Sequence, residues 1–229
     1  MTRVDTTMAT SSRPAKAFYT LARTCCVVFC RVWMRMTVEG LEHVPAEGGF
    51  VLAPVHRSNI DTPISSVVTR RRLRYMGKDT LWEKPFWRWF LSALGGFPVS
   101  RGSIDLEALS RCVEVLKGGE PLVLFPEGER KSGPVVQPLF DGAAYVAARA
   151  GVPIIPVGIG GSERVMAKGS KMVHPHKVHV IIGRPIEVPS TPSGRVPRDG
   201  VRKATAELHA ELQELFDRAS LRAGDGTER

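Results

Sequence analysis

Only four cysteines occur among the 229 residues, and no two of them form a CxxC pair. Cys25, Cys26 and Cys30 crowd one short stretch, while Cys112 lies far along the chain. This pattern does not resemble the disulfide framework of a small secreted domain. We therefore expect reduced thiols and a cytosolic setting.

Long apolar runs are also missing. The amino terminus lacks the basic region, apolar run and small-residue cleavage site of a signal peptide. The longest apolar run near it is interrupted by Arg23, Arg31 and Arg35, whereas a membrane-spanning helix needs roughly 20 mostly apolar residues. We expect neither a secretory leader nor a membrane span.

Motifs of several large enzyme classes are absent as well. The sequence contains no GxxxxGK[ST], no GxGxxG and no GxSxG, so nucleotide-driven, dehydrogenase and serine-hydrolase functions have no motif support. His174, His176 and His179 lie within six residues, but no acidic partner accompanies them, which favours a loop entering a strand over a metal site. We expect no metal and no cofactor.

Acidic residues are outnumbered by basic ones. The chain has 32 Lys and Arg against 23 Asp and Glu, a net charge of +9. This balance favours an anionic partner such as nucleic acid, an acidic membrane surface or a phosphorylated substrate. Because nothing resembles a nucleic-acid-binding motif, we expect no nucleic acid partner.

The sequence does contain short β-type runs that alternate with helical patterns. A hydrophobic content of 43% over this length suits one domain with a sizeable core. We predict an α/β fold, in which a single domain over 37–221 holds a mixed, largely buried sheet of about seven strands flanked by helices. The predicted strands are 36–41, 49–54, 73–77, 96–100, 121–125, 153–159 and 178–183.

Helices are predicted near 104–117, with Ser103 as the N-cap, and near 201–221. The Ser/Thr-rich residues 1–14 and the polar residues 222–229 are expected to be disordered tails.

Residues 15–36 predict an amphipathic amino-terminal helix. Its polar side chains gather in one arc, and Phe18, Phe29 and Trp33 supply apolar surface. Such a helix suits a membrane interface, and the alternative is a helix that covers the core of the domain.

The first candidate for chemistry is the segment from His56 to Asp61, directly after the buried strand 49–54. Ligands of open α/β sheets bind at such strand ends. A carboxylate on one imidazole nitrogen fixes the tautomer and makes the other nitrogen a better acceptor for the proton of an attacking hydroxyl. The alternative is a polar turn in which Asp61 caps a helix.

Cationic residues follow three other predicted strands. Lys78 follows the strand 73–77, Arg101 follows 96–100, and Arg130 closes the run Phe-Pro-Glu-Gly-Glu-Arg that begins at the end of 121–125. Singly, each suits a solvated loop end, but together with the His–Asp pair they suit a site for a phosphate group.

These blocks resemble those of the glycerolipid acyltransferase family, which includes 1-acylglycerol-3-phosphate and glycerol-3-phosphate acyltransferases. The resemblance is ordered along the chain and spans residues 56–157. His56–Asp61 is similar to the family's HxxxxD block, Gly96–Arg101 to GxxFxxR, Phe125–Arg130 to FPEGxR, and Val152–Val157 to its final proline block.

The resemblance implies transfer of a fatty acyl group from acyl-CoA or acyl-carrier protein to the hydroxyl of a lysophosphatidate-type acceptor at an anionic membrane surface. It implies His56 as general base and Asp61 as the residue that orients it. It further implies a substrate site made of Lys78, Arg101, Glu127, Gly128 and Arg130. The expected location is peripheral, on the cytoplasmic face of the cell membrane.

Two departures from the family pattern keep other acceptors open. The second block lacks the frequent Ile-Asp before Arg101, and Glu129 stands where Thr is usual. A carboxylate beside a phosphate site could repel phosphate or bind another headgroup. The alternatives are therefore another lysophospholipid, glycerol-3-phosphate or a glycolipid as acceptor, and, more remotely, a basic membrane- or nucleic-acid-binding module without catalysis.

A second candidate for membrane contact is a predicted helical face that carries aromatic residues near several arginines. Aromatic rings with cations suit a lipid interface, whereas packing against the sheet would make them core or a wall of an acyl-chain tunnel. The residues are Trp82, Phe86, Trp89 and Ala93, preceded by Arg70, Arg71, Arg72 and Arg74.

Overall fold

The computed structural model describes residues 12–99, 106–189 and 196–225. Within them, seven strands form one mixed sheet in the order β1-β7-β6-β2-β5-β3-β4, which confirms the predicted fold class. The five strands from β6 to β4 are parallel, β7 is antiparallel to β6, and β1 is parallel to β7. The strands are β1 (Thr37–Glu39), β2 (Val51–Pro54), β3 (Arg74–Lys78), β4 (Gly96–Val99), β5 (Leu122–Val123), β6 (Ile154–Gly160) and β7 (His179–Ile182).

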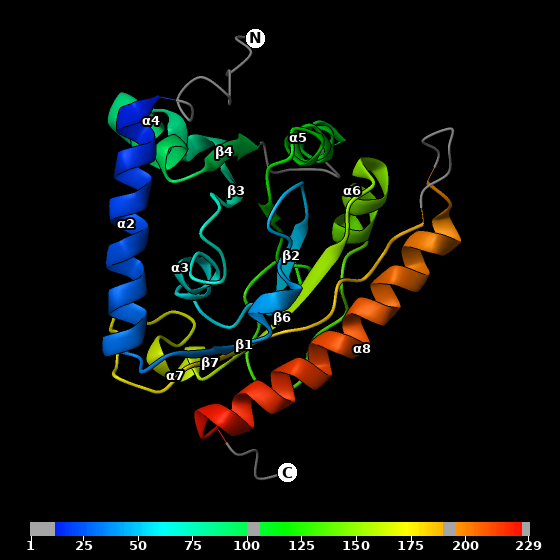
Figure 1. Cartoon of the computed structure of the whole chain (residues 1–229). Helices are drawn as coiled ribbons and strands as arrows, with labels where there is room; N and C mark the ends of the chain where they lie inside the picture. The colour runs from blue at the N-terminus through cyan, green and yellow to red at the C-terminus, as the bar shows by residue number, and fades with distance from the viewer. Residues whose placement is uncertain (1–11, 100–105, 190–195, 226–229) are drawn as a thin grey trace.

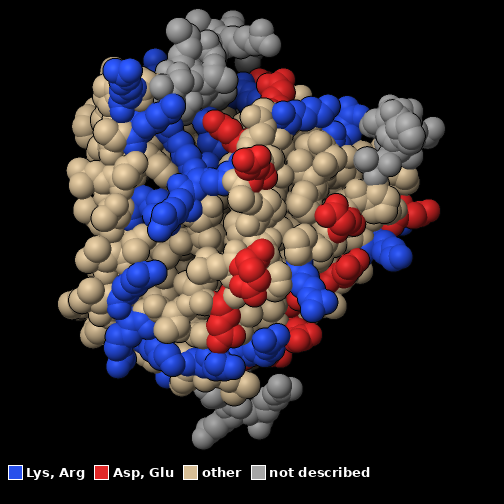
Figure 2. Space-filling model, in the orientation of Figure 1, with Lys and Arg blue, Asp and Glu red and all other residues tan. Residues whose placement is uncertain are grey.

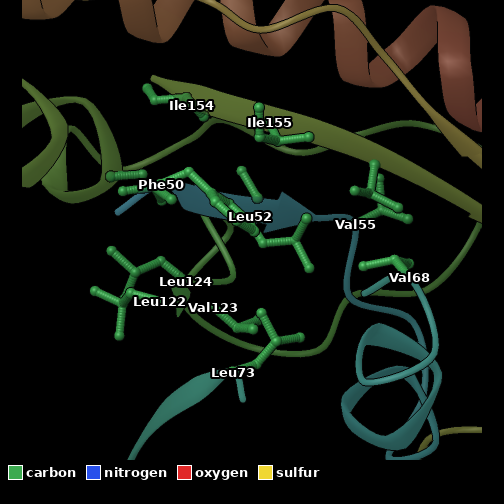
Figure 3. Close-up of a cluster of buried hydrophobic side chains, with 14 of the residues drawn as sticks. Phe50, Leu52, Val55, Val68, Leu73, Leu122, Val123, Leu124, Ile154 and Ile155 are labelled. Atoms are coloured by element: carbon green, nitrogen blue, oxygen red, sulfur yellow. The ribbon is translucent and has the colours of Figure 1, made fainter. Parts of the chain in front are cut away.

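The apolar runs in the sequence form the centre of this sheet. Every residue of β2, β5, β6 and β7 is buried, as expected for strands that are covered on both faces. Figure 3 shows side chains of these strands, among them Leu52, Leu122 and Ile155, meeting in one cluster. The core therefore lies around the central strands β6, β2 and β5, whose residues are all buried.

Helices cover the sheet, as Figure 1 shows. Helices α5, α6 and α8 lie together on one side, while α2, α3 and α4 lie at the other end of the view. Their bounds are α2 (Arg13–Val32), α3 (Asp61–Ser65), α4 (Pro85–Ala93), α5 (Leu106–Lys117), α6 (Gly142–Ala150), α7 (Ser162–Val165) and α8 (Arg198–Ala223), with short 3₁₀ helices η1 (Leu41–His43) and η2 (Asp79–Trp82).

The longest helix, α8, packs directly on β6. A Cβ added at Gly158 would lie 2.4 Å from the carbonyl carbon of Leu215, and one added at Gly160 would lie 2.3 Å from that of Ala219. Both glycines thus let the helix backbone approach the strand closely. The expected helix at 201–221 is confirmed and begins three residues earlier.

Helix α2 begins after Ser12, whose side-chain oxygen accepts the N–H of Ala15 at 3.4 Å. It ends at Val32 rather than at residue 36. The chain must turn there to enter the sheet edge as β1, and Arg35 has a positive φ of 45° in that turn. Among the described residues, none of the helices has the length and apolar character needed to cross a bilayer. Ser103, the expected cap of α5, lies outside the described residues.

Candidate active site

The carboxyl ends of four parallel strands bring the sequence blocks to one edge of the sheet. His56 follows β2, Phe125 to Arg130 follow β5, Lys78 ends β3, and β4 leads toward Arg101. Because β5 lies between β2 and β3, the segment after β5 lies between the His56 loop and the end of β3. This edge is where open α/β sheets bind ligands.

His56 and Asp61 form a hydrogen-bonded pair at this edge. The Nδ1 of His56 lies 3.1 Å from Oδ2 of Asp61. The side chain of Asp61 is fully buried, whereas that of His56 is 16% exposed. Because a carboxylate can only accept, Nδ1 carries the hydrogen and Nε2 keeps its lone pair for a substrate proton.

Asp61 also organises the loop in which His56 lies. Its Oδ2 accepts the backbone N–H groups of Arg57 and Ser58, each at 2.7 Å. The alternative of a polar turn therefore describes part of what Asp61 does, although the N–H groups belong to the loop and not to α3. One carboxylate oxygen both shapes the turn and orients the imidazole.

Phe125 closes one face of the imidazole. Its ring centroid lies 3.9 Å from that of His56, with 20° between the ring planes. The aromatic face limits rotation of the imidazole and offers favourable electrostatics when the ring becomes positively charged. The sequence pattern placed Phe125 in a motif without indicating this stacking.

The turn after β5 requires glycine at position 128. Gly128 has a φ of 72°, and a Cβ there would lie 2.6 Å from the ring of Phe140. The exposed Phe140 donates its backbone N–H to the carbonyl of Pro126 at 2.9 Å, which holds the ring over the turn. Gly128 therefore shapes this rim of the site by permitting the turn.

Glu127 points into the protein from the same turn. It is buried and forms an ion pair with the buried Arg57, whose Nη1 lies 2.7 Å from Oε2. Arg57 is a site residue that the sequence pattern did not reveal. The only available signal in the sequence was an arginine within the His56–Asp61 block and a glutamate within the Phe125–Arg130 block.

Arg130 and its neighbours form the exposed rim. The N–H of Lys131 donates to the carbonyl of His56 at 2.9 Å, and Nζ of Lys131 lies 2.8 Å from Oε1 of Glu129. The hydrogen bond that Nζ of Lys131 donates to Glu129, together with the charges of Lys131 and Lys168, lowers the pKa of Glu129. The additional carboxylate is thus paired with cations, while Arg130 is partly exposed and takes part in no ion pair among the described residues.

Lys78 and Arg101 are placed less fully. The backbone of Lys78 pairs with Val99 at the ends of β3 and β4, on the same edge of the sheet as His56. The side chain of Lys78 and the whole of Arg101 lie outside the described residues.

An apolar cavity of about 360 Å³ lies beside the His–Asp pair. Thr62 and Pro63, which follow Asp61 directly, form part of its wall, and the hydroxyl of Tyr75 donates to the carbonyl of Thr62 at 3.3 Å. The remaining wall comes from α2, β3, η2, α4 and the start of β4. The cavity therefore lies between helix α3, which begins at Asp61, and helices α2 and α4.

The aromatic face predicted around α4 is divided. Trp82 and Ala93 are buried, and Trp82 lines the cavity, whereas Phe86 and Trp89 are exposed. The alternative of core or cavity wall therefore holds for Trp82 and Ala93, and membrane contact by Phe86 and Trp89 stays a prediction.

The arginine run before β3 serves the interior rather than a free surface. Arg71 donates to the carbonyls of Pro45 and Gly119, Arg72 to those of Ser92 and Ala93, and Arg74 forms an ion pair with Glu120. These contacts hold loops and a helix end together.

A family model described as Acyltransferase matches residues 35–160, a range that contains all four blocks. The chain belongs to this acyltransferase family.

Individual relatives point the same way. The chain is 30% identical over 153 residues to the chloroplastic 1-acyl-sn-glycerol-3-phosphate acyltransferase of Brassica napus, a match that covers 65% of this chain and 44% of that protein. This chain thus spans less than half the length of that relative. It is 28% identical over 185 residues to the 1-acyl-sn-glycerol-3-phosphate acyltransferase of Bacillus subtilis (strain 168), covering 78% of this chain and 90% of that one.

The fold has a solved counterpart. The crystal structure of the 1-acyl-sn-glycerophosphate (LPA) acyltransferase PlsC from Thermotoga maritima is similar to this chain with a TM-score of 0.69 and 25% sequence identity. The similarity covers 90% of this chain and 84% of that chain.

Proposed function

We propose that this protein transfers a fatty acyl group from an acyl thioester, acyl-CoA or acyl-carrier protein, to the hydroxyl of 1-acylglycerol-3-phosphate, which yields phosphatidic acid. The observation that carries the proposal is the 3.1 Å contact between Nδ1 of His56 and the buried carboxylate of Asp61, at the sheet edge beside an apolar cavity. Relatives named 1-acyl-sn-glycerol-3-phosphate acyltransferases support this choice of acceptor.

The chemistry needs one base and no cofactor. Nε2 of His56 takes the proton of the acceptor hydroxyl as its oxygen bonds to the thioester carbonyl carbon. The tetrahedral intermediate then collapses, the carbon–sulfur bond breaks, and the leaving thiolate takes the proton from the imidazolium. Asp61 stabilises the imidazolium between these two steps and keeps its orientation.

The substrate groups have separate places. Arg130, together with Arg101 and Lys78, would bind the acceptor phosphate, since guanidinium and ammonium groups pair with phosphate oxygens. An acyl chain would occupy the apolar cavity that begins at Thr62 and Pro63. Glu129, paired with Lys131, leaves the rim with an excess of positive charge.

The test is an assay of purified protein in detergent micelles with a panel of acceptors and both donors. We expect 1-acylglycerol-3-phosphate to have the highest kcat/KM, above glycerol-3-phosphate, other lysophospholipids and glycolipid acceptors. Acyl transfer to a neutral lysophospholipid or glycolipid alone would assign the alternative acceptor, and salt-sensitive DNA binding without acyl transfer would assign the non-catalytic module.

We further propose that the protein attaches peripherally to the cytoplasmic face of the cell membrane through α2. The outer face of this helix exposes large apolar side chains, and such a patch beside cations suits a lipid interface. Figure 2 shows a largely uncharged edge over α2 with Lys and Arg beside it. The exposed apolar residues are Leu21, Val28, Phe29, Val32 and Trp33.

Helix α4 extends the same surface. Phe18 of α2 contacts Trp89 of α4 with 5.2 Å between ring centroids, and Phe86 and Trp87 of α4 are exposed. The other face of α2 is fixed to the domain, because Nε of Arg23 donates to the carbonyl of Thr69 at 2.8 Å. Deleting residues 1–36 would therefore remove a wall of the cavity, so surface substitutions make the sharper test.

The test is co-sedimentation with anionic and neutral vesicles at low and high salt. Phe29→Ser/Trp33→Ser should weaken binding to both vesicle types, whereas high salt should release only part of the wild-type protein, since apolar insertion does not depend on ions. Leu221→Ser, which changes an exposed apolar residue on α8, is the control. Unchanged binding by the α2 variant, with loss in Phe86→Ser/Trp87→Ser, would transfer the role to α4.

A further inference from the structure

Arg57 and Glu127 form an ion pair that is almost completely withdrawn from solvent. Their side chains are 1% and 0% exposed, and Nη1 of Arg57 lies 2.7 Å from Oε2 and 3.0 Å from Oε1 of Glu127. Removing two charges from water costs free energy that apolar side chains of similar volume would not cost. Stability alone does not account for such a pair.

The remaining hydrogen-bonding capacity of the pair joins other segments of the protein. The guanidinium donates to two carbonyls of the loop after the turn and lies over an aromatic ring of α8, and the carboxylate accepts one more backbone N–H. The contacts are Nε to the Gly133 carbonyl at 3.2 Å, Nη2 to the Val135 carbonyl at 3.1 Å, the guanidinium carbon to the Phe216 ring centroid at 4.8 Å, and the Gln137 N–H to Oε1 at 3.0 Å.

The pair also holds the backbone of His56 from both sides. The N–H of His56 donates to Oε2 of Glu127 at 3.2 Å, and its carbonyl accepts from Nη1 of Arg57, also at 3.2 Å. The backbone N–H of Arg57 itself donates to Oδ2 of Asp61. Since the direction of a side chain follows its backbone, the pair sets where the imidazole points.

We propose that Arg57 and Glu127 are positioning residues for acyl transfer: they hold the imidazole of His56 against the incoming hydroxyl without touching substrate. This inference rests on the proposed function, in which His56 is the base. The proposal places Glu127 beneath the substrate pocket, because both of its carboxylate oxygens already accept hydrogen bonds from other groups of the protein. A disturbed pair should lower kcat and leave acceptor binding largely unchanged.

Arg57→Lys tests the proposal with the charge retained. Lysine keeps a cation for Glu127 but cannot donate to all three carbonyls in the arrangement of a guanidinium. We expect kcat to fall roughly 10- to 100-fold, since displacements of about 1 Å at a reacting group have this effect, and the KM of the acceptor to stay within about twofold. A raised acceptor KM at unchanged kcat would overturn the proposal.

Arg74→Lys is the matched control. Arg74 also forms an ion pair with a glutamate, at 3.0 Å from Glu120, and its side chain is 3% exposed. It begins β3 and therefore lies at the opposite end of the strands from His56. This variant should keep the wild-type kcat. An equal loss of kcat in both variants would show a general effect of buried arginines and overturn the proposal.

The double variant Arg57→Met/Glu127→Leu removes the pair without leaving an unpaired buried charge. Its melting temperature should fall, because the backbone groups of His56, Gly133, Val135 and Gln137 lose their partners, and kcat should stay low in the folded protein. A folded double variant with the wild-type kcat would show that the pair has no positioning role.

Nitrogen-15 NMR of histidine-labelled protein gives a readout without substrate. The His56 signals, identified by their loss in His56→Gln, should show hydrogen at Nδ1 in the wild type and a changed tautomer population in Arg57→Lys. Identical His56 signals in the folded variant overturn the positioning role whatever the activity. A wild-type protein that transfers no acyl group refutes the proposed function instead, so the two failures are distinguishable.

Discussion

Replacing Asp61 with asparagine isolates the contribution of one buried negative charge to catalysis. Asparagine has the same shape, and its amide oxygen can take the place of Oδ2, which accepts from His56, Arg57 and Ser58. Its amide nitrogen then takes the place of Oδ1, a buried atom with no hydrogen-bond partner in the described residues. The loop therefore keeps its hydrogen bonds, while the imidazolium loses its counter-charge.

The size of the effect follows from the distance. Nδ1 and Oδ2 are 3.1 Å apart. Taking the two delocalised charges as about 4 Å apart, their attraction is about 4 kcal/mol at an effective dielectric constant of about 20. Since each 1.4 kcal/mol or so is tenfold in rate, kcat should fall about 10³-fold.

The assay is steady-state acyl transfer to 1-acylglycerol-3-phosphate, with circular dichroism to confirm folding. Asp199→Asn, at an exposed position in the first turn of α8, is the control and should match the wild type. The double variant His56→Ala/Asp61→Asn should have the same kcat as His56→Ala. Asp61 acts on catalysis only through the imidazole, so its substitution adds nothing once the imidazole is gone. A folded Asp61→Asn enzyme with kcat within about threefold of the wild type would refute the reasoning.

Three further outcomes are expected. Arg101→Ala and Arg130→Ala should each raise the acceptor KM about tenfold and leave the donor KM unchanged in steady-state kinetics, and a loss confined to the donor would exclude the phosphate role. Gly158→Ala should lower the melting temperature by about 5 °C through overpacking against α8, whereas Gly142→Ala, whose new methyl meets only a side chain at 3.9 Å, should not. Burial lowers the pKa of His179 from its usual 6.5, so the unfolded chain binds a proton that the native state does not. Stability should therefore fall as the pH drops below about 6.5, and urea titrations should show a weaker fall in His179→Gln.

Several features of this protein follow from the sequence because they depend on neighbours along the chain. Short apolar runs bounded by turn residues favour buried strands, and each of the seven strands overlaps one of the predicted ranges. His56 and Asp61 are five residues apart, so a single turn brings them together whatever surrounds it. The sequence also predicts one shared edge for the residues that follow the parallel strands, because parallel strands end on the same side.

Other features were decided only when distant segments met. The ion pair of Arg57 with Glu127 joins residues 70 positions apart, and the stacking of Phe125 on His56 depends equally on β5 lying beside β2. No local pattern specifies that neighbour relation, because it follows from how the whole sheet buries its strands. For the same reason the arginines before β3, which resemble a surface patch in the sequence, turn inward: the carbonyls that they satisfy come from loops and a helix end that only the folded chain brings near them.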